Sequence, residues 1–163
     1  MNPPPTNPDA PADPLTRAIE WAVRSVELGG GPFGAVVVHE GRIVGEGHNR
    51  VTLDRDPTAH AEVVALRAAA ATLDRFDLTG CVLYSSCEPC PMCLGAAHWS
   101  RVERVVFAAD RHDAARAGFD DAELYEELQR ELPERRLPLE QRLAEAGRAP
   151  FEAWARHAGR TAY

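Results

Sequence analysis

The amino-acid sequence predicts an α/β fold, with a mixed five-stranded sheet between helices in three layers. Two observations predict it. Apolar residues follow helix-like and strand-like spacing in alternation along the chain, and two strand-like runs near the start are joined by a tight turn. Strands that alternate with helices form layered α/β sheets, and the opening hairpin makes this sheet mixed. The 163 residues, 45% of them hydrophobic, suffice for one domain with its own core.

The first half of the chain supplies a helix, a hairpin and a second helix. In the first helix, apolar side chains recur every three or four positions, and three consecutive glycines end it. A valine-rich run and a shorter run on either side of Glu40-Gly41 are typical of a hairpin. The elements predicted here are a helix over 15–28, strands over 33–39 and 42–47, and a helix over 59–73.

The second half continues the alternation. Proline suits the first turn of a helix, so Pro91 marks a helix start. Alternating leucines favour a fifth strand late in the chain, and Pro138 within it favours an edge position, because proline has no N–H to donate. The elements predicted here are strands over 81–85, 102–108 and 136–143, and helices over 91–99, 121–132 and 151–158.

Composition indicates how the chain is organised and where it is located. Residues 1–14 include six prolines and almost nothing apolar, which is typical of a disordered tail, so we expect the domain to span 15–163. No apolar run approaches the roughly 18 residues that a membrane span needs. No basic region followed by an apolar stretch opens the sequence. The expected location is therefore the cytoplasm, with no membrane partner.

The charge of the chain argues against nucleic acid as a partner. The net charge is −7, all 18 Lys and Arg residues are arginines, and no basic run occurs. A protein that binds phosphate backbones needs a concentrated positive surface. We therefore expect the ligand to be a small molecule rather than RNA or DNA.

Three of the four cysteines lie close together near the predicted helix start at Pro91. In a cytoplasmic chain such clustering indicates a metal site or catalysis rather than disulfides. Cys90 and Cys93 are three residues apart, which places both sulfurs on one face, and a helix N-terminus favours their thiolates. Two thiolates together with an imidazole, here from His60, are ligands that favour zinc.

The number of ligands decides the kind of zinc site. One His and two Cys give three ligands, which leaves a position for water, as in catalytic zinc sites. Zinc lowers the pKa of that water to roughly 7, so hydroxide is available at neutral pH. Glu62, two residues after His60, is placed to take the proton and pass it to a leaving amine. A closed four-ligand site that includes Cys87 is the alternative, but it would not explain Glu62.

The segments that carry these ligands resemble a known family. The pattern His-x-Glu with Pro-Cys-x-x-Cys, here His60-Ala61-Glu62 and Pro89-Cys90-Pro91-Met92-Cys93, is the signature of zinc-dependent nucleobase deaminases. Within the cytidine deaminase-like superfamily, the chain resembles the bacterial guanine deaminases over residues 15–163. The resemblance also includes PFGAVVV at 32–38, DPTAHAEV at 56–63, SCEPCPMCLGA at 86–96, AGFDD at 117–121, FEAW at 151–154 and the terminal Tyr163.

The resemblance implies a cytidine deaminase-like fold, one Zn²⁺ per subunit, and hydrolysis of guanine to xanthine and ammonia, a step of purine catabolism. It implies that Glu62 is the proton shuttle and that Asp121 contacts the substrate and assists proton transfer. The other residues implied to bind the purine are Phe33, Asn49, Ala61 through its N–H, Trp99, Tyr163 and the ring of His60.

An acceptor at Asp121 would fit guanine better than adenine or cytosine. An ionised Asp only accepts hydrogen bonds, and guanine presents N–H donors at its ring edges. The ring nitrogens beside the amino groups of adenine and cytosine are acceptors, and the unpaired buried groups that result discriminate strongly. Without the resemblance, plainer interpretations stay open: Asn49 as a turn residue, Phe33 and Trp99 as core, Asp121 as a helix cap, and Tyr163 as a frayed end.

The resemblance further implies a homodimer with an exchanged segment. In the family the C-terminal segment, here about 144–163, crosses to the partner subunit, so Tyr163 would close the neighbour's site. Two alternatives to a guanine deaminase stay open. One is a deaminase of another aminated ring, such as guanosine, a triazine-like ring, cytosine or the adenosine of tRNA. The other is a non-catalytic binding module stapled by zinc.

Overall fold

The structure, a computed structural model, describes residues 13–163. Residues 1–12 of the tail predicted over 1–14 lie outside the described residues, and Pro14 belongs to the first helix. The described chain begins with helix α1 (Pro14–Glu27), close to the helix that the sequence predicts. Asp13 caps it, because its carboxylate accepts hydrogen bonds from the N–H groups of Leu15 and Thr16.

A mixed sheet of four strands forms the centre of the fold. The strands, in the spatial order β2-β1-β3-β4, are β1 (Gly34–His39), β2 (Arg42–His48), β3 (Cys81–Cys87) and β4 (Arg104–Ala109). β1 pairs antiparallel with β2 and β3, whereas β3 pairs parallel with β4. The predicted hairpin is confirmed. Glu40 and Gly41 form its turn with positive φ angles of 49° and 75°, as two-residue hairpin turns of this kind require.

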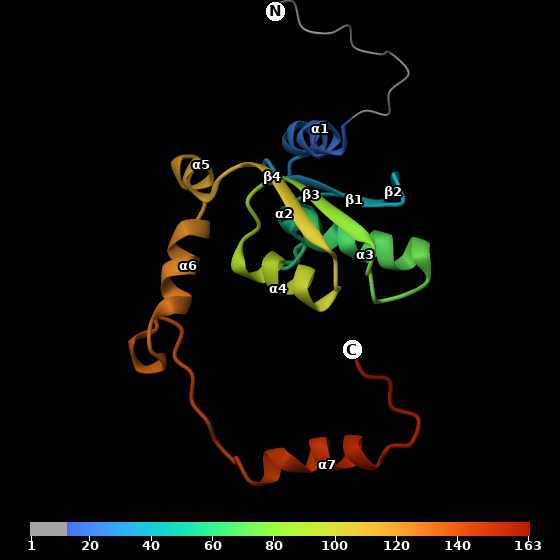
Figure 1. Cartoon of the computed structure of the whole chain (residues 1–163). Coiled ribbons are helices and arrows are strands. Elements are labelled where there is room, and N and C mark those ends of the chain that lie inside the picture. The colour runs from blue at the N-terminus through green and yellow to red at the C-terminus, as the bar shows by residue number, and fades with distance from the viewer. Residues whose placement is uncertain (1–12) are drawn as a thin grey trace, which may run out of the picture.

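Helices cover both faces of the sheet, and this confirms the predicted layers. Figure 1 shows α1 on one face, and α3 (Ala61–Leu73) with α4 (Pro91–Trp99) on the other. The main core lies between the sheet and α3. Its buried residues are Ala35, Val37, Ala61, Ala65, Leu66, Ala69, Leu78, Cys81, Leu83 and Ala97.

Small residues allow α3 to lie very close to the sheet. A Cβ atom added to Gly45 in β2 would lie 2.3 Å from the main-chain oxygen of Ala65 and 2.6 Å from the nitrogen of Ala69. A Cβ on Gly47 would lie 2.4 Å from the oxygen of Ala61. No side chain fits in these gaps, so the glycines fix the distance of α3 from the sheet and the point where α3 begins.

Two short helices, α2 (Val51–Asp54) and α5 (Arg111–Arg116), are absent from the sequence prediction. Both are too short to show a helical period of apolar residues. α5 begins with reciprocal caps, in which Asp110 accepts from the N–H of Asp113 and Asp113 accepts from the N–H of Asp110. It is followed by α6 (Asp121–Gln129). Over the described range, no helix combines the length and apolar character that crossing a membrane demands.

The predicted fifth strand over 136–143 is wrong. Its leucines alternate, but Leu137, Leu139 and Leu143 are 74%, 58% and 81% exposed. Among residues 13–163, no strand pairs with this segment. Alternation gives a segment an apolar face, but a strand also needs a neighbour that bonds to its N–H and C=O groups. The sheet therefore has four strands, and β4 lies at its edge.

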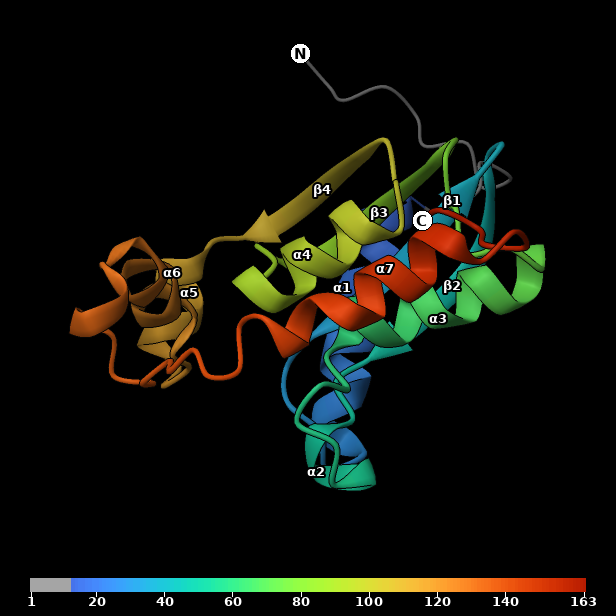
Figure 2. The ribbon, with the colours of Figure 1, turned by 90° about the horizontal axis from the view of Figure 1, so that it is seen from below.

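The last part of the chain extends away from the body as an arm, which we define as residues 136–163. Every residue of the arm is exposed. The arm contains a short 3₁₀ turn (Ala146–Arg148) and α7 (Ala149–Arg156), near the predicted last helix, and another 3₁₀ turn (Leu132–Glu134) precedes it. Figure 1 shows α7 apart from the body, and Figure 2, seen from below, shows it in front of α3 and α4. The arm thus lies on the α3–α4 side without burying its own side chains.

We predict that Gly45→Ala lowers the free energy of unfolding by about 3 kcal/mol, because the new methyl group overlaps main-chain atoms of α3. Chemical denaturation at a fixed protein concentration measures the change. Gly147→Ala is the matched control, since nothing lies within 4 Å of a Cβ atom there. Equal stability of the two variants would contradict the close contact between α3 and β2.

Candidate metal centre

Two helices begin at the same place, and the residues at their N-termini carry candidate metal ligands. His60 directly precedes α3, Cys90 directly precedes α4, and Cys93 lies in the first turn of α4. The ligand atoms of these three residues all lie within 4.8 Å of one another. Cys90 Sγ is 3.6 Å from His60 Nδ1. Neither His60 nor Cys90 caps its own helix through its side chain, so both side chains are free to meet.

The electrostatics of this group favour a bound cation. The pKa of the Cys90 thiol is lowered to about 4, because Cys93 donates a hydrogen bond to it and the His60 ring lies beside it. The pKa of Cys93 is raised, because its thiol holds the proton that the two sulfurs share. The N-termini of α3 and α4 add partial positive charge that stabilises a thiolate. Two sulfurs and one imidazole fit zinc, with one of four tetrahedral positions left for another ligand.

The other two cysteines lie outside the group. Cys87, at the end of β3, points its sulfur at the main-chain oxygen of Asp110, 3.5 Å away. Burial raises the pKa of this thiol to about 11. Cys81 is fully buried at the start of β3. All four cysteines are free of disulfides. The structure thus brings three candidate ligands together and leaves Cys87 apart.

Glu62 lies beside the candidate ligands in the first turn of α3. It is 5% exposed, and the hydroxyl of Ser85 donates a hydrogen bond to its Oε1 at 3.1 Å. Burial raises the pKa of this carboxyl, because water no longer stabilises its charge. A carboxyl with a raised pKa holds a proton more readily and is suited to transfer it.

A cavity of about 240 Å³ opens onto these groups. Its aromatic wall is formed by Phe33 and Phe119, which meet edge to face with ring centroids 4.8 Å apart. Pockets that hold drug-sized ligands measure about 300–1,000 Å³, so this cavity suits a smaller molecule. The other residues that line it are Gly31, Asn49, Val51, Thr52, His60, Glu62, Glu88, Cys90 and Asp121.

Asn49 is held in one orientation by the main chain. Its Oδ1 accepts hydrogen bonds from the N–H groups of Gly31 and Val51, at 3.4 and 3.3 Å. The opposite amide orientation would place an NH₂ group against two N–H donors, so it is excluded. Asn49 therefore offers its NH₂ group, a donor only, to whatever occupies the cavity.

The start of α6 brings Asp121 to the same cavity. Burial raises the pKa of this half-buried carboxyl, and the neighbouring Cys90 thiolate raises it further. When ionised, the carboxylate only accepts hydrogen bonds. The cavity thus presents a donor from Asn49 and an acceptor from Asp121 to its occupant.

The remaining expected site residues divide into two groups. Ala61 is fully buried at the first position of α3, where its N–H has no partner within the helix. Trp99 and Tyr163, by contrast, are absent from the lining of the cavity. Trp99 is 62% exposed at the end of α4, and its ring centroid lies 5.8 Å from that of Tyr163. A single chain therefore does not bring these two rings to the metal centre.

Sequence reasoning missed three residues of the site. Phe119 lines the cavity, and its place inside the AGFDD segment was the available signal. Glu88 also lines the cavity and stands within the cysteine cluster, but its partner Arg111 is 23 residues away. Ser85 bonds to Glu62 from β3, and an ordinary strand serine gives no signal of such a contact.

Comparison with known families and sequences covers most of the chain. The model of the cytidine and deoxycytidylate deaminase zinc-binding region matches residues 12–109, which include all three candidate ligands and Glu62. The guanine deaminase of Bacillus subtilis is 49% identical over 150 residues, which are 91% of this chain and 96% of that protein. The tRNA-specific adenosine deaminase of Aquifex aeolicus is 46% identical over 95 residues, but these are only 58% of this chain and 63% of that protein.

The comparison with solved structures also finds a guanine deaminase. An X-ray structure of guanine deaminase from Bacillus subtilis matches with a TM-score of 0.89 and 46% identity. The match covers 97% of this chain and 99% of that chain. It therefore extends beyond the sheet into the arm, whereas the family model ends at β4.

We predict that Cys93→Ser loses most of its zinc and that Cys87→Ser retains it, because only Cys93 lies with His60 and Cys90. Metal analysis after reconstitution with zinc and removal of free ions measures the difference. A Cys87→Ser protein that binds no zinc would indicate a four-ligand site instead.

Proposed function

The chain belongs to the cytidine and deoxycytidylate deaminase family of zinc-dependent hydrolases, and from that premise we propose that it hydrolyses guanine to xanthine and ammonia. The observation that carries the proposal is the cavity itself. It pairs a donor at Asn49 with an acceptor at Asp121 beside three candidate metal ligands. The likeness to the guanine deaminase of Bacillus subtilis over 91% of the chain supports the same substrate.

One Zn²⁺ per chain is the proposed cofactor, held by His60, Cys90 and Cys93. Their softness and number favour zinc at a catalytic rather than a structural site. When bound, zinc supplies a Lewis acid that lowers the pKa of a water molecule to about 7. The cavity opens onto His60 and Cys90, so a substrate there would lie beside the metal.

Glu62 is the proposed proton carrier. Deamination of guanine joins a water oxygen to C2 and breaks the bond from C2 to its amino nitrogen, which leaves as ammonia. The oxygen must lose both of its protons, of which one goes to ring nitrogen N3 and one to the leaving amino nitrogen. The buried Glu62 carboxylate, oriented by Ser85, can take each proton from the oxygen and pass it to a nitrogen without exchange with solvent.

The hydrogen-bonding groups of the cavity complement guanine. Guanine presents the acceptors O6 and N7 on one edge, and the Asn49 NH₂ group can donate to them. Its N–H donors can bond to Asp121, and the Ala61 N–H can serve a ring acceptor. Adenine carries an amino group in place of O6, so donor would face donor at Asn49. Phe33 and the His60 ring would flank the faces of the purine, together with Phe119.

The size of the cavity favours a free base over larger substrates. About 240 Å³ lies below the range for drug-sized ligands, which suits a free base. A tRNA substrate would also need a basic surface, whereas the net charge is −7. The match to the tRNA-specific adenosine deaminase of Aquifex aeolicus covers only 58% of the chain. Other small aminated rings, such as triazines, are the alternatives that the experiments below separate from guanine.

The proposed quaternary structure is a homodimer in which the two subunits exchange their C-terminal segments. The arm exposes large apolar side chains, among them Phe151 at 75% and Tyr163 at 72%, and an apolar groove lies between the end of the arm and helices α3 and α4. Exchange of about residues 144–163 between two subunits would cover such surfaces. Tyr163, which lies outside the cavity of its own chain, would then close the neighbour's site. Trp99 belongs to α4 rather than to the exchanged segment, so it would reach that site across the interface between the two subunits.

We place this reaction in the cytoplasm, as part of purine catabolism. Clustered cysteines that serve as metal ligands rather than in disulfides are typical of a reducing compartment, and all four cysteines are free of disulfides. The single domain proposed for residues 15–163 contains every group that the reaction uses, apart from the aromatic cover supplied by the partner.

We predict that the zinc-loaded protein releases ammonia from guanine and much less from adenine. Glu62→Gln should retain zinc and lower kcat by about 10²–10⁴-fold, because the amide cannot carry the proton. Coupled detection of ammonia and metal analysis measure the two quantities.

Three other outcomes would each point elsewhere. Turnover of a triazine or of guanosine without turnover of guanine would identify a different deaminase. Full zinc content without release of ammonia from any base would favour a zinc-stapled binding module. A Glu62→Gln protein with unchanged kcat would remove Glu62 from the reaction.

We predict a dimer, with a mass of about twice 17.8 kDa by light scattering. Deletion of Tyr163 should lower kcat/KM for guanine by about tenfold or more while zinc stays bound, and Tyr163→Phe should retain most activity because the ring remains. Mixing the deletion variant with Glu62→Gln should restore activity, since one centre then receives an intact partner arm. Failure to restore it would contradict the exchange of arms.

A further inference from the structure

Two helices beyond the sheet are tied to the loop that carries Cys90. Arg111, the first residue of α5, makes a forked ion pair with Glu88, in which Nε donates to Oε2 at 3.0 Å and a terminal nitrogen donates to Oε1. The main-chain N–H of Arg111 donates to the same carboxylate at 3.1 Å. Forked bonds of this kind combine strength with a fixed geometry. They tie the start of α5 to a residue two positions before Cys90.

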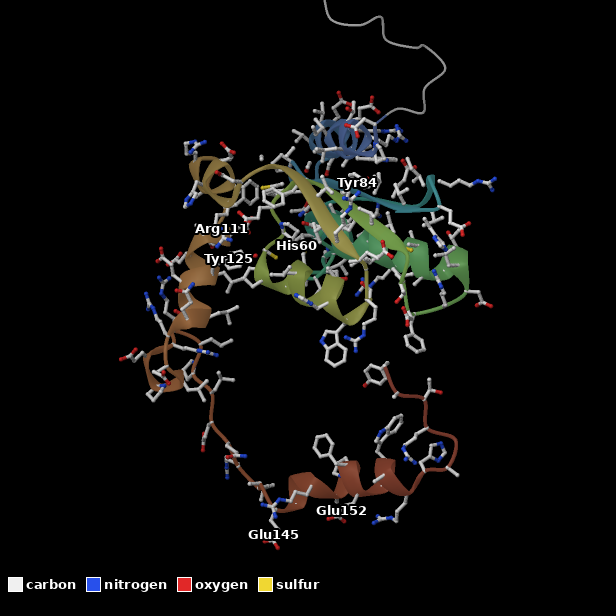
Figure 3. The ribbon with its side chains drawn as sticks, viewed as in Figure 1. His60, Tyr84, Arg111, Tyr125, Glu145 and Glu152 are labelled. Atoms are coloured by element: carbon white, nitrogen blue, oxygen red, sulfur yellow. The ribbon has the colours of Figure 1, made fainter. Side chains whose placement is uncertain are left out.

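Tyr125 adds two contacts from α6. Its hydroxyl donates to the main-chain oxygen of Pro89 at 2.7 Å. The guanidinium carbon of Arg111 lies 3.6 Å from the centre of the Tyr125 ring, as in a cation–π contact. Figure 3 shows these two labelled side chains next to each other where α5 and α6 meet the body, on the side of His60. We call Glu88, Arg111 and Tyr125 the Arg111 cluster.

The Arg111 cluster is partly shielded from water. The side chains of Glu88 and Arg111 are 17% and 30% exposed. A second ion pair on α5, between Arg116 and Asp113, is 71% and 45% exposed. Exposed pairs contribute little, because solvent and salt screen them. The same helix therefore offers one ion pair that can fix geometry and one that serves as its control.

The position of Asp121 depends on these contacts. No residue of α6 is fully buried, and the helix packs mainly against α5 and α4. Tyr125 follows Asp121 by four residues, so the two side chains share one face of α6. A contact that fixes Tyr125 against Pro89 thereby fixes Asp121 relative to Cys90.

We propose that the Arg111 cluster positions Asp121, and with it Phe119, against the metal centre for reaction with the substrate. Arg111, Glu88 and Tyr125 are positioning residues, because they act through Asp121. This inference rests on the proposed function for its kinetic consequences, but the placement of Asp121 can be measured without turnover.

Two conservative variants test the kinetic consequence. Arg111→Lys keeps the charge but loses the fork and the flat stacking surface. Tyr125→Phe loses only the hydroxyl. Both should keep one zinc per chain and lower kcat/KM for guanine about tenfold or more, because small displacements of a substrate-positioning group are costly. Arg116→Lys is the matched control and should leave kcat/KM unchanged.

A double variant separates positioning from general stabilisation. In an Asp121→Asn protein, the added Arg111→Lys change should lower kcat/KM little further, because the group that the cluster positions is already gone. Equal losses in the presence and absence of the Asp121 carboxylate would show that the cluster only stabilises the fold. That result would overturn the proposal.

Amide hydrogen exchange tests the placement without any reaction. In the zinc-loaded protein, exchange over residues 119–125 should be about tenfold faster in Arg111→Lys and Tyr125→Phe than in Arg116→Lys. Unchanged exchange in both variants would refute the proposal, whatever the enzyme turns over. Faster exchange in a protein that does not act on guanine would leave the positioning role in place and refute only the proposed substrate.

Discussion

The contact between α3 and β2 is the constraint on which the rest of the site depends. Glycines in β2 allow the main chain of α3 to approach so closely that a single added methyl group would overlap it. This contact fixes where α3 begins, and therefore where His60 and Glu62 lie. β3 leads through Cys87 into the loop before α4, which brings Cys90 and Cys93 to the same point. The ligands are far apart in the sequence, and they meet because α3 and α4 begin at the same point of the fold.

The parts of the fold that sequence predicted correctly are those with local signals. α1, the hairpin, α3 and α4 each show their apolar spacing within a few turns or residues, and helix-start signals lie near the ligands. The fifth strand failed because alternation at Leu137 and Leu139 describes a face, whereas a strand needs a partner from elsewhere. The short α2 and α5 failed because neither is long enough to show a period.

Some features of the candidate site also have a local signal in the sequence, and others do not. The clustering of His60, Cys90 and Cys93 could be anticipated, because cysteine spacing and the chemistry of zinc are visible in the chain. The orientation of Asn49 could not, since it depends on the N–H groups of Gly31 and Val51 in the folded chain. The Arg111 cluster could not be anticipated either, because contacts between residues 23 and 36 positions apart have no periodic pattern in the sequence.

The proposed exchange of arms has a consequence for the stability of α7. α7 has eight residues, whereas isolated helices shorter than about 12–15 residues are marginal in water. Its side chains are all exposed, so burial within its own subunit compensates little of the entropy lost in ordering it. In the proposed dimer, the helical state of α7 is coupled to the surface of the partner subunit. At high dilution this segment should be the first to lose its helix, while the sheet and the metal ligands keep their shape.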